Sequence, residues 1–156
     1  MRKKILPLEE PVQSDAIDVP SLATVYVTSE DPAHPIDLAF DGRQGRGATH
    51  WLAADTGPQT VTIAFDHPQA IRTVVIETEE RDASRTQELA LSISKDGGRT
   101  YRDVRRQEFN FSQDGATWER EDWTLAEQEV THVRLAIKPD KGGRPFRAAL
   151  TTFAVT

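Results

Sequence analysis

The sequence predicts an all-β protein, an antiparallel sandwich or barrel of about eight short strands. Three observations lead to this prediction. Apolar and polar residues alternate in short runs, which places the apolar side chains on one face of a strand. Turn-forming residues separate these runs at regular intervals, and hardly a helical pattern lies between them. The 156 residues are enough for one domain with a buried core.

The alternating runs define the predicted strands in order. They cover residues 22–27, 60–65, 71–78, 89–93, 100–111, 117–125, 133–137 and 149–155. Clusters of Gly, Pro and charged residues predict the loops between them. These loops cover residues 29–35, 43–48, 66–68, 79–86, 95–98 and 139–145.

Residues 36–42 interrupt this pattern with one short helical turn. The apolar residues from Ile36 to Phe40 have helical rather than strand spacing. Asp41-Gly42 then ends the turn, because Asp can bond to nearby backbone groups and Gly tolerates a positive φ. After the loop, Trp51 is expected to return the chain to the core.

Residues 1–20 are expected to form an extended arm ahead of a sandwich domain over residues 21–156. Three prolines stand in this stretch among acidic residues, and proline neither continues a helix nor donates to a sheet. The basic start resembles a signal peptide, but Glu9, Glu10 and Pro11 interrupt its apolar run. We therefore expect a cytoplasmic location, unless the chain is a piece of an exported protein.

Composition argues against several classes of function. The net charge of −6 disfavours nonspecific binding to nucleic acid or to an anionic membrane. The chain has no cysteine, which excludes disulfides, thiolate metal sites and cysteine nucleophiles. Its histidines lack metal-ligand spacing, and no P-loop or dinucleotide-binding glycine pattern opens a helix. We expect a protein that is not an enzyme.

Four sequence blocks occur in a recognisable order. They are Leu38-Ala39-Phe40-Asp41-Gly42 with Thr49 and Trp51, the strand pair 60–65 and 71–76, Ser94-Lys95-Asp96-Gly97 with Tyr101, and Val133-Arg134-Leu135-Ala136-Ile137. In this order they resemble the discoidin, or coagulation-factor type-C, domain family over about residues 22–156. The resemblance implies a galactose-binding-like β-sandwich of the jelly-roll type. It also implies non-catalytic binding of sugars, phospholipid head groups or protein partners by loops at one end.

The resemblance further implies a structural calcium ion near these loops. The family pattern assigns it to Asp41, Thr49, loop carbonyls and a glutamate of the last strand, and the position of this glutamate falls near Thr152. Calcium takes six to eight oxygen ligands, and Thr brings less charge than Glu. The alternative is a metal-free turn that the Asp41 side chain caps.

Six loop residues match the family's ligand-binding positions. They are Glu30, His34, Arg81, Arg85, Arg144 and Phe146. The resemblance implies that the polar members bind sugar hydroxyls and that Phe146 stacks on the apolar face of a sugar ring. The alternative for each arginine is a solvated surface charge, and for His34 an exposed loop histidine. The favoured function is therefore carbohydrate binding.

Two other functions remain open. A protein-interaction domain would use an outward tryptophan, because Trp118 and Trp123 differ by an odd number and point to opposite faces of one strand. It could also use the ribbon Arg99–Arg106. Nucleic-acid binding is the third alternative, and the acidic net charge counts against it.

Overall fold

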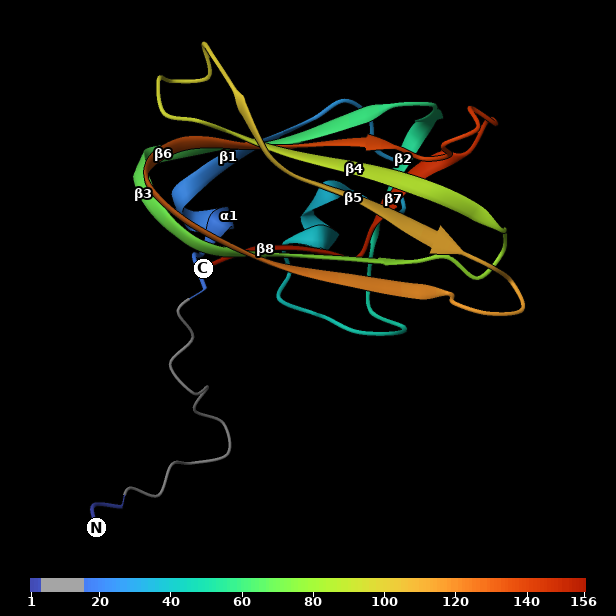
Figure 1. Cartoon of the computed structure of the whole chain (residues 1–156), viewed down its shortest axis with the longest axis horizontal. Helices are drawn as coiled ribbons and strands as arrows, with labels where there is room; N and C mark the ends of the chain where they lie inside the picture. The colour runs from blue at the N-terminus through green and yellow to red at the C-terminus, as the bar shows by residue number, and fades with distance from the viewer. Residues whose placement is uncertain (4–15) are drawn as a thin grey trace.

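The computed structural model describes residues 1–3 and 16–156, and it confirms the antiparallel β-sandwich (Figure 1). The elements of the described part are α1 (Val19–Leu22), β1 (Ala23–Val27), the 3-10 turn η1 (Ile36–Ala39), β2 (Trp51–Thr56), β3 (Gln59–Glu79), β4 (Arg85–Ser94), β5 (Arg102–Phe111), β6 (Trp118–Lys138), β7 (Arg147–Leu150) and β8 (Thr152–Val155). The short helical turn predicted after residue 35 is confirmed as η1.

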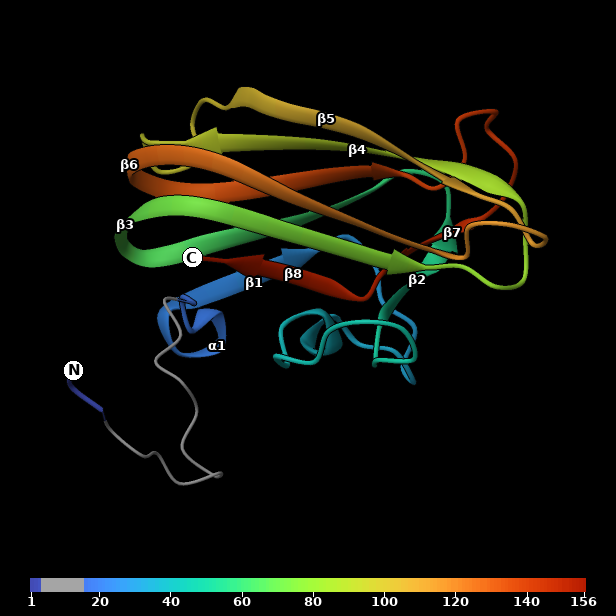
Figure 2. The ribbon, with the colours of Figure 1, turned by 60° about the horizontal axis from the view of Figure 1, so that its bottom comes forward.

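Two long strands, β3 and β6, build both layers of the sandwich. They pair with each other along most of their length, and register shifts between Ala64 and Thr73 let the pair fold over, as Figure 2 shows at its left. The first half of β3 pairs with β1 and the second half with β8. The second half of β6 pairs with β4, which pairs with β5. A separate pair, β2 and β7, completes the end of the sandwich.

The prediction of separate strands on either side of residues 66–68 is wrong. The chain stays extended through this bend and forms one strand, β3, and the runs 117–125 and 133–137 likewise join into β6. The bend resembles a turn in sequence because it contains Pro68. It is built by irregular pairing, and Ala126 and Glu129 of β6 lie there at positive φ, a conformation that one type of β-bulge uses.

The last predicted strand is divided in two. Residues 149–155 change sheets at Thr151, so that β7 pairs with β2 and β8 pairs with β3. At the other terminus, Leu22 ends α1 instead of starting β1. These differences move element boundaries but leave the layers as predicted.

Residues 16–20 lie against the sandwich. The Ile17 amide donates to the Val155 carbonyl at 2.8 Å, and Val19 is buried. The rest of the predicted arm, residues 4–15, lies outside the described residues. In the described ranges no helix is both long and apolar enough to span a membrane.

The core confirms the alternating pattern. Val61 and Ile63 of β3, Leu91 of β4 and Leu135 of β6 are fully or almost fully buried, and so is Trp51, as predicted. At one end of the sandwich, the connections 80–84, 112–117 and 139–146 gather at the right of Figure 1. This end positions the site.

Candidate ligand-binding site

A pocket of about 440 Å³ opens at this end of the sandwich. It lies between the end of β3, the start of β4 and the start of β7. The charged and aromatic side chains along it include His50, Glu79, Arg81, Asp82, Arg85 and Phe146. A pocket of this size with convergent polar groups is typical of a small-ligand site.

Arg85 forms part of this pocket, but it does not lie in a loop as predicted. It is the first residue of β4, and only 4% of it is exposed. Its guanidinium donates to Glu80 at 2.7 Å, to the Pro139 carbonyl at 2.5 Å and to Gln87 at 3.1 Å. A buried cation needs such partners, and here they tie β4 to the connection 139–146.

Phe146 borders the same pocket and is half-buried. The guanidinium carbons of Arg85 and Arg144 lie 5.7 and 5.0 Å from its ring centroid. Arg144 donates through two nitrogens to the Asp140 carboxylate, each at 3.0 Å, and to the Ser84 carbonyl at 3.0 Å. This bonding lowers the pKa of Asp140 to about 2. Arg144 thus anchors the loop that carries Phe146.

Arg81 is the exposed arginine of the pocket. Its side chain is 63% exposed, and it donates to the Glu79 carboxylate at 3.3 Å. Glu79 also accepts a hydrogen bond from the Gly47 amide. The guanidinium therefore sits at the rim with most of its surface available to a ligand.

His34 does not line the pocket itself but contacts a second histidine that does. Its ring stacks on that of His50, with 4.6 Å between centroids, and His50 lines the pocket. Burial, with a further contribution from the nearby His34, lowers the pKa of His50 below its ordinary value. Glu30 instead stabilises the start of η1, because its carboxylate accepts a hydrogen bond from the Ile36 amide at 2.8 Å.

The predicted residues thus divide into groups. Arg81, Arg85 and Phe146 lie around one pocket, His34 stands beside it, and Glu30 and Arg144 support its loops. Five charged or polar lining residues were missed, namely His50, Glu79, Glu80, Asp82 and Arg147. The sequence could have indicated His50. Neighbouring side chains of an extended chain point to opposite faces, so the residue before the inward Trp51 points away from the core.

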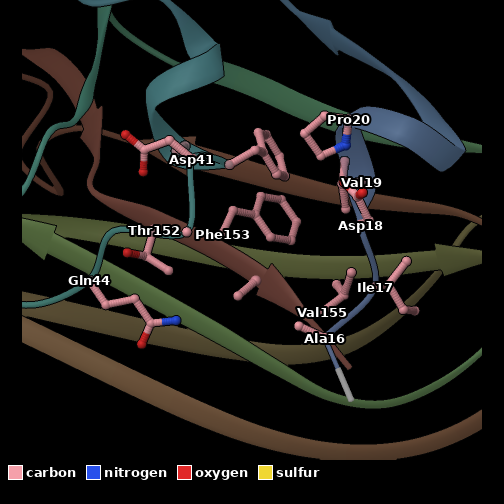
Figure 3. A pocket seen from close by; sticks show the side chains of 14 residues that line it. Ala16, Ile17, Asp18, Val19, Pro20, Asp41, Gln44, Thr152, Phe153 and Val155 are labelled. Carbon is pink, nitrogen blue, oxygen red and sulfur yellow. The ribbon is translucent and has the colours of Figure 1, made fainter. Parts of the chain in front are cut away.

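The predicted calcium residues bond to each other and to the backbone. The Thr49 hydroxyl donates to the Asp41 carboxylate, which also accepts the Arg43 amide at 2.9 Å. Thr152 lies nearby on β8, where its hydroxyl donates to the Arg43 carbonyl at 3.2 Å. Figure 3 shows Asp41, Gln44 and Thr152 around a second pocket of about 410 Å³.

Next to the loop that carries Asp41 and Arg43, the buried carboxylate of Glu77 is already paired with a guanidinium. Glu77 pairs with Thr152 across the β3–β8 ladder, and only 1% of it is exposed. It accepts the Gly45 amide at 3.3 Å and Arg120 at 3.1 Å, and Arg120 also donates to Gln44 at 3.2 Å.

This donor set does not fit a calcium ion. Calcium needs six to eight oxygens, with carboxylates among them. The loop offers Asp41, Thr152 replaces the glutamate of the family pattern, and the carboxylate of Glu77 faces a guanidinium. Over residues 1–3 and 16–156, no cluster of three or more His, Cys, Asp or Glu residues could hold a metal.

Most of the side chains considered for a protein partner have contacts within the chain. Trp123 is buried, and Trp118 is half-buried with the Arg46 guanidinium 5.6 Å from its ring. In the ribbon Arg99–Arg106, Arg102 pairs with Glu127, Arg106 pairs with Asp103, and Arg99 and Arg105 donate to backbone carbonyls. Trp118 thus keeps part of its surface exposed beside Arg46, and its use as a partner surface stays a prediction.

Comparisons with known proteins agree with this architecture. The family model of the F5/8 type C domain matches residues 24–150. A search of curated protein sequences finds no match.

Several solved structures have a similar fold. The family 32 carbohydrate-binding module of Clostridium perfringens NanJ, solved with galactose, has a TM-score of 0.63 at 18% identity, covering 90% of this chain and 96% of its own. A chitosan-binding module from Paenibacillus sp. IK-5 has a TM-score of 0.63 at 19% identity, covering 90% and 98%. The AlyQ module, solved with 4,5-unsaturated mannuronic acid, has a TM-score of 0.60 at 17% identity, covering 86% and 95%. At these identities the likeness shows the fold.

Proposed function

We propose that this chain, which belongs to the F5/8 type C domain family, is a non-catalytic module that binds carbohydrate in the pocket at the end of its sandwich. One observation carries the proposal. Strands and loops that are far apart in sequence bring Arg81, His50 and Phe146 together around a single pocket of about 440 Å³. The fold likeness to modules solved with sugars supports the same function.

The chemistry of the pocket suits a sugar. A pyranose ring has hydroxyls that need directed hydrogen bonds and an apolar face that needs an apolar partner. Arg81 offers exposed donors, His50 offers a ring nitrogen, and the Phe146 ring lies at the border. Arg85 and Arg144 fix the positions of these groups through their bonds to Glu80 and Asp140. Such fixed walls lower the entropy lost on binding.

Isothermal titration with galactose and with GalNAc-β-1,3-galactose tests this function. We expect heat of binding for the wild type and a loss of about tenfold in affinity for Arg81→Ala, since one charge-assisted hydrogen bond is removed. Arg106→Ala is the matched control, because Arg106 is also exposed and ion-paired but lies on β5. No binding of any glycan on an array, by a protein with the expected β-rich circular dichroism, would contradict the proposal.

A further inference from the structure

We propose that the pocket accepts uncharged sugars and rejects sugar acids such as uronates, an inference that rests on the carbohydrate-binding function proposed above. It begins from the arginines of the pocket. A uronate carboxylate is ionised at neutral pH, and proteins hold such a group most strongly with an arginine or lysine whose charge no protein carboxylate already neutralises. The question is therefore whether the pocket has such a cation.

Each pocket arginine already has its own carboxylate. Arg85 pairs with Glu80 at 2.7 Å, and both side chains are largely buried. Arg81 pairs with Glu79 at 3.3 Å. Arg147 pairs at 3.1 Å with Asp31, which lies in the loop after β1. The three cations are thus matched by three carboxylates.

The histidine of the pocket adds no positive charge. Burial lowers the pKa of His50 below its ordinary value, so its ring is neutral near pH 7. Its stacked neighbour His34 faces the carboxylate of Asp31 at 3.4 Å. The stacked pair therefore offers ring nitrogens that can hydrogen-bond to sugar hydroxyls.

One lining carboxylate is left over. Asp82 has no ion-pair partner among the residues that the structure describes, and its own amide donates to Glu80 at 3.1 Å. Counted with Asp31, which does not line the pocket but pairs with Arg147, the carboxylates around the pocket exceed its arginines by one. A bound uronate would lie near Asp82 and beside Glu79 or Asp31, and repulsion from these like charges weakens its binding.

The fold alone leaves the charge of the ligand open. Structures of similar fold include a module solved with galactose and another solved with 4,5-unsaturated mannuronic acid. The side chains of the pocket must therefore determine whether a neutral or an acidic sugar binds. In this chain the pairing of its arginines favours the uncharged class.

Titration of the whole chain with galactose and with galacturonic acid at pH 7 tests this inference. The two sugars share most hydroxyls and differ by one carboxylate. We expect galacturonic acid to bind at least about tenfold more weakly than galactose, the size of one unfavourable charge contact near a protein surface. Galacturonic acid binding as tightly as galactose would overturn the inference and leave the carbohydrate proposal standing. If neither sugar binds and no other glycan on an array does, both proposals fail.

The variant Glu79→Gln identifies the group responsible. It removes the carboxylate that neutralises Arg81, so the gap between the two sugars should narrow to less than about threefold. Glu127→Gln is the matched control, because Glu127 pairs with Lys95 and Arg102, which do not line the pocket. This control should leave the gap unchanged. An unchanged gap in Glu79→Gln would show that pairing of Arg81 does not set the preference.

Discussion

Two glutamates on the same face of β3 show how burial changes the role of an ion pair. Glu77 is 1% exposed, binds Arg120 and accepts an amide from the loop 40–49. Glu79, two residues on, is 17% exposed, binds the exposed Arg81 and accepts the Gly47 amide from the same loop. The first pair is part of the framework, whereas the second faces the candidate pocket.

The difference follows from desolvation. Removing one member of a buried pair leaves a charge without compensation, which is strongly destabilising. An exposed pair contributes little to stability because water can replace either partner. The pair Arg81–Glu79 can therefore exchange protein contacts for ligand contacts at low cost, and the pair Arg120–Glu77 cannot. The predictions below test this contrast.

Arg120→Met should have the largest effect on stability. It leaves the buried carboxylate of Glu77 without its cation and should lower the free energy of unfolding by about 3 kcal/mol. Urea denaturation measures this value. Arg102→Met, which removes an exposed cation of the pair with Glu127, should cost less than about 1 kcal/mol. Equal costs for the two variants would contradict the contrast.

Phe146→Ala should affect binding more than folding. Loss of the aromatic ring at the pocket border should weaken sugar binding by about tenfold, as expected when a sugar loses an aromatic partner. Titration calorimetry measures the loss. Tyr26→Ala, at an exposed aromatic residue of β1 on the sheet surface, serves as the control. Retained affinity in Phe146→Ala would place the ligand elsewhere.

Acid should weaken the support of the Phe146 loop. Bonding to Arg144 lowers the pKa of Asp140 to about 2 from 3.8, so this carboxylate stabilises the fold above the unfolded pKa. That contribution is lost as the pH falls from about 4 to about 2. Asp140→Asn should therefore show a smaller loss of melting temperature than the wild type over this range. If the melting temperatures of the variant and the wild type fall equally with pH, the pair Arg144–Asp140 does not contribute to stability.

Calcium should have the smallest effect. Because Arg120 supplies the positive charge at Glu77 and Thr152 replaces a carboxylate, millimolar calcium and EDTA should give the same melting temperature. Differential scanning calorimetry measures the difference. A rise in melting temperature with calcium would show that Asp41 and the loop carbonyls suffice for a site.

Local pattern was enough to predict most of the fold. Alternation around Val61 and Leu135 predicted the strands, and the spacing from Ile36 to Phe40 predicted the helical turn. The bend of β3 was missed because Asp66-His67-Pro68 has the composition of a turn, whereas the pairing with β6 that keeps it extended is a long-range contact.

The sequence predicted those site residues that lie in connections between strands and remain exposed or half-buried. Arg81 and Phe146 lie in connections, and both border the pocket. Arg85 was misplaced because its partners, among them the Pro139 carbonyl, are distant in sequence and convert a charged residue into a buried one. The same holds for Glu77 and Arg120, which meet only across the β3–β6 ladder.

Nuclear magnetic resonance of the labelled chain during a galactose titration tests the central claim most directly. We predict that backbone amide shifts change at residues 79–85 and at Phe146 and Arg147, with little change along β5. Shifts confined to β5 or to the loop 40–49, or no shifts at saturating galactose and other uncharged sugars, would contradict a sugar site at this end of the sandwich.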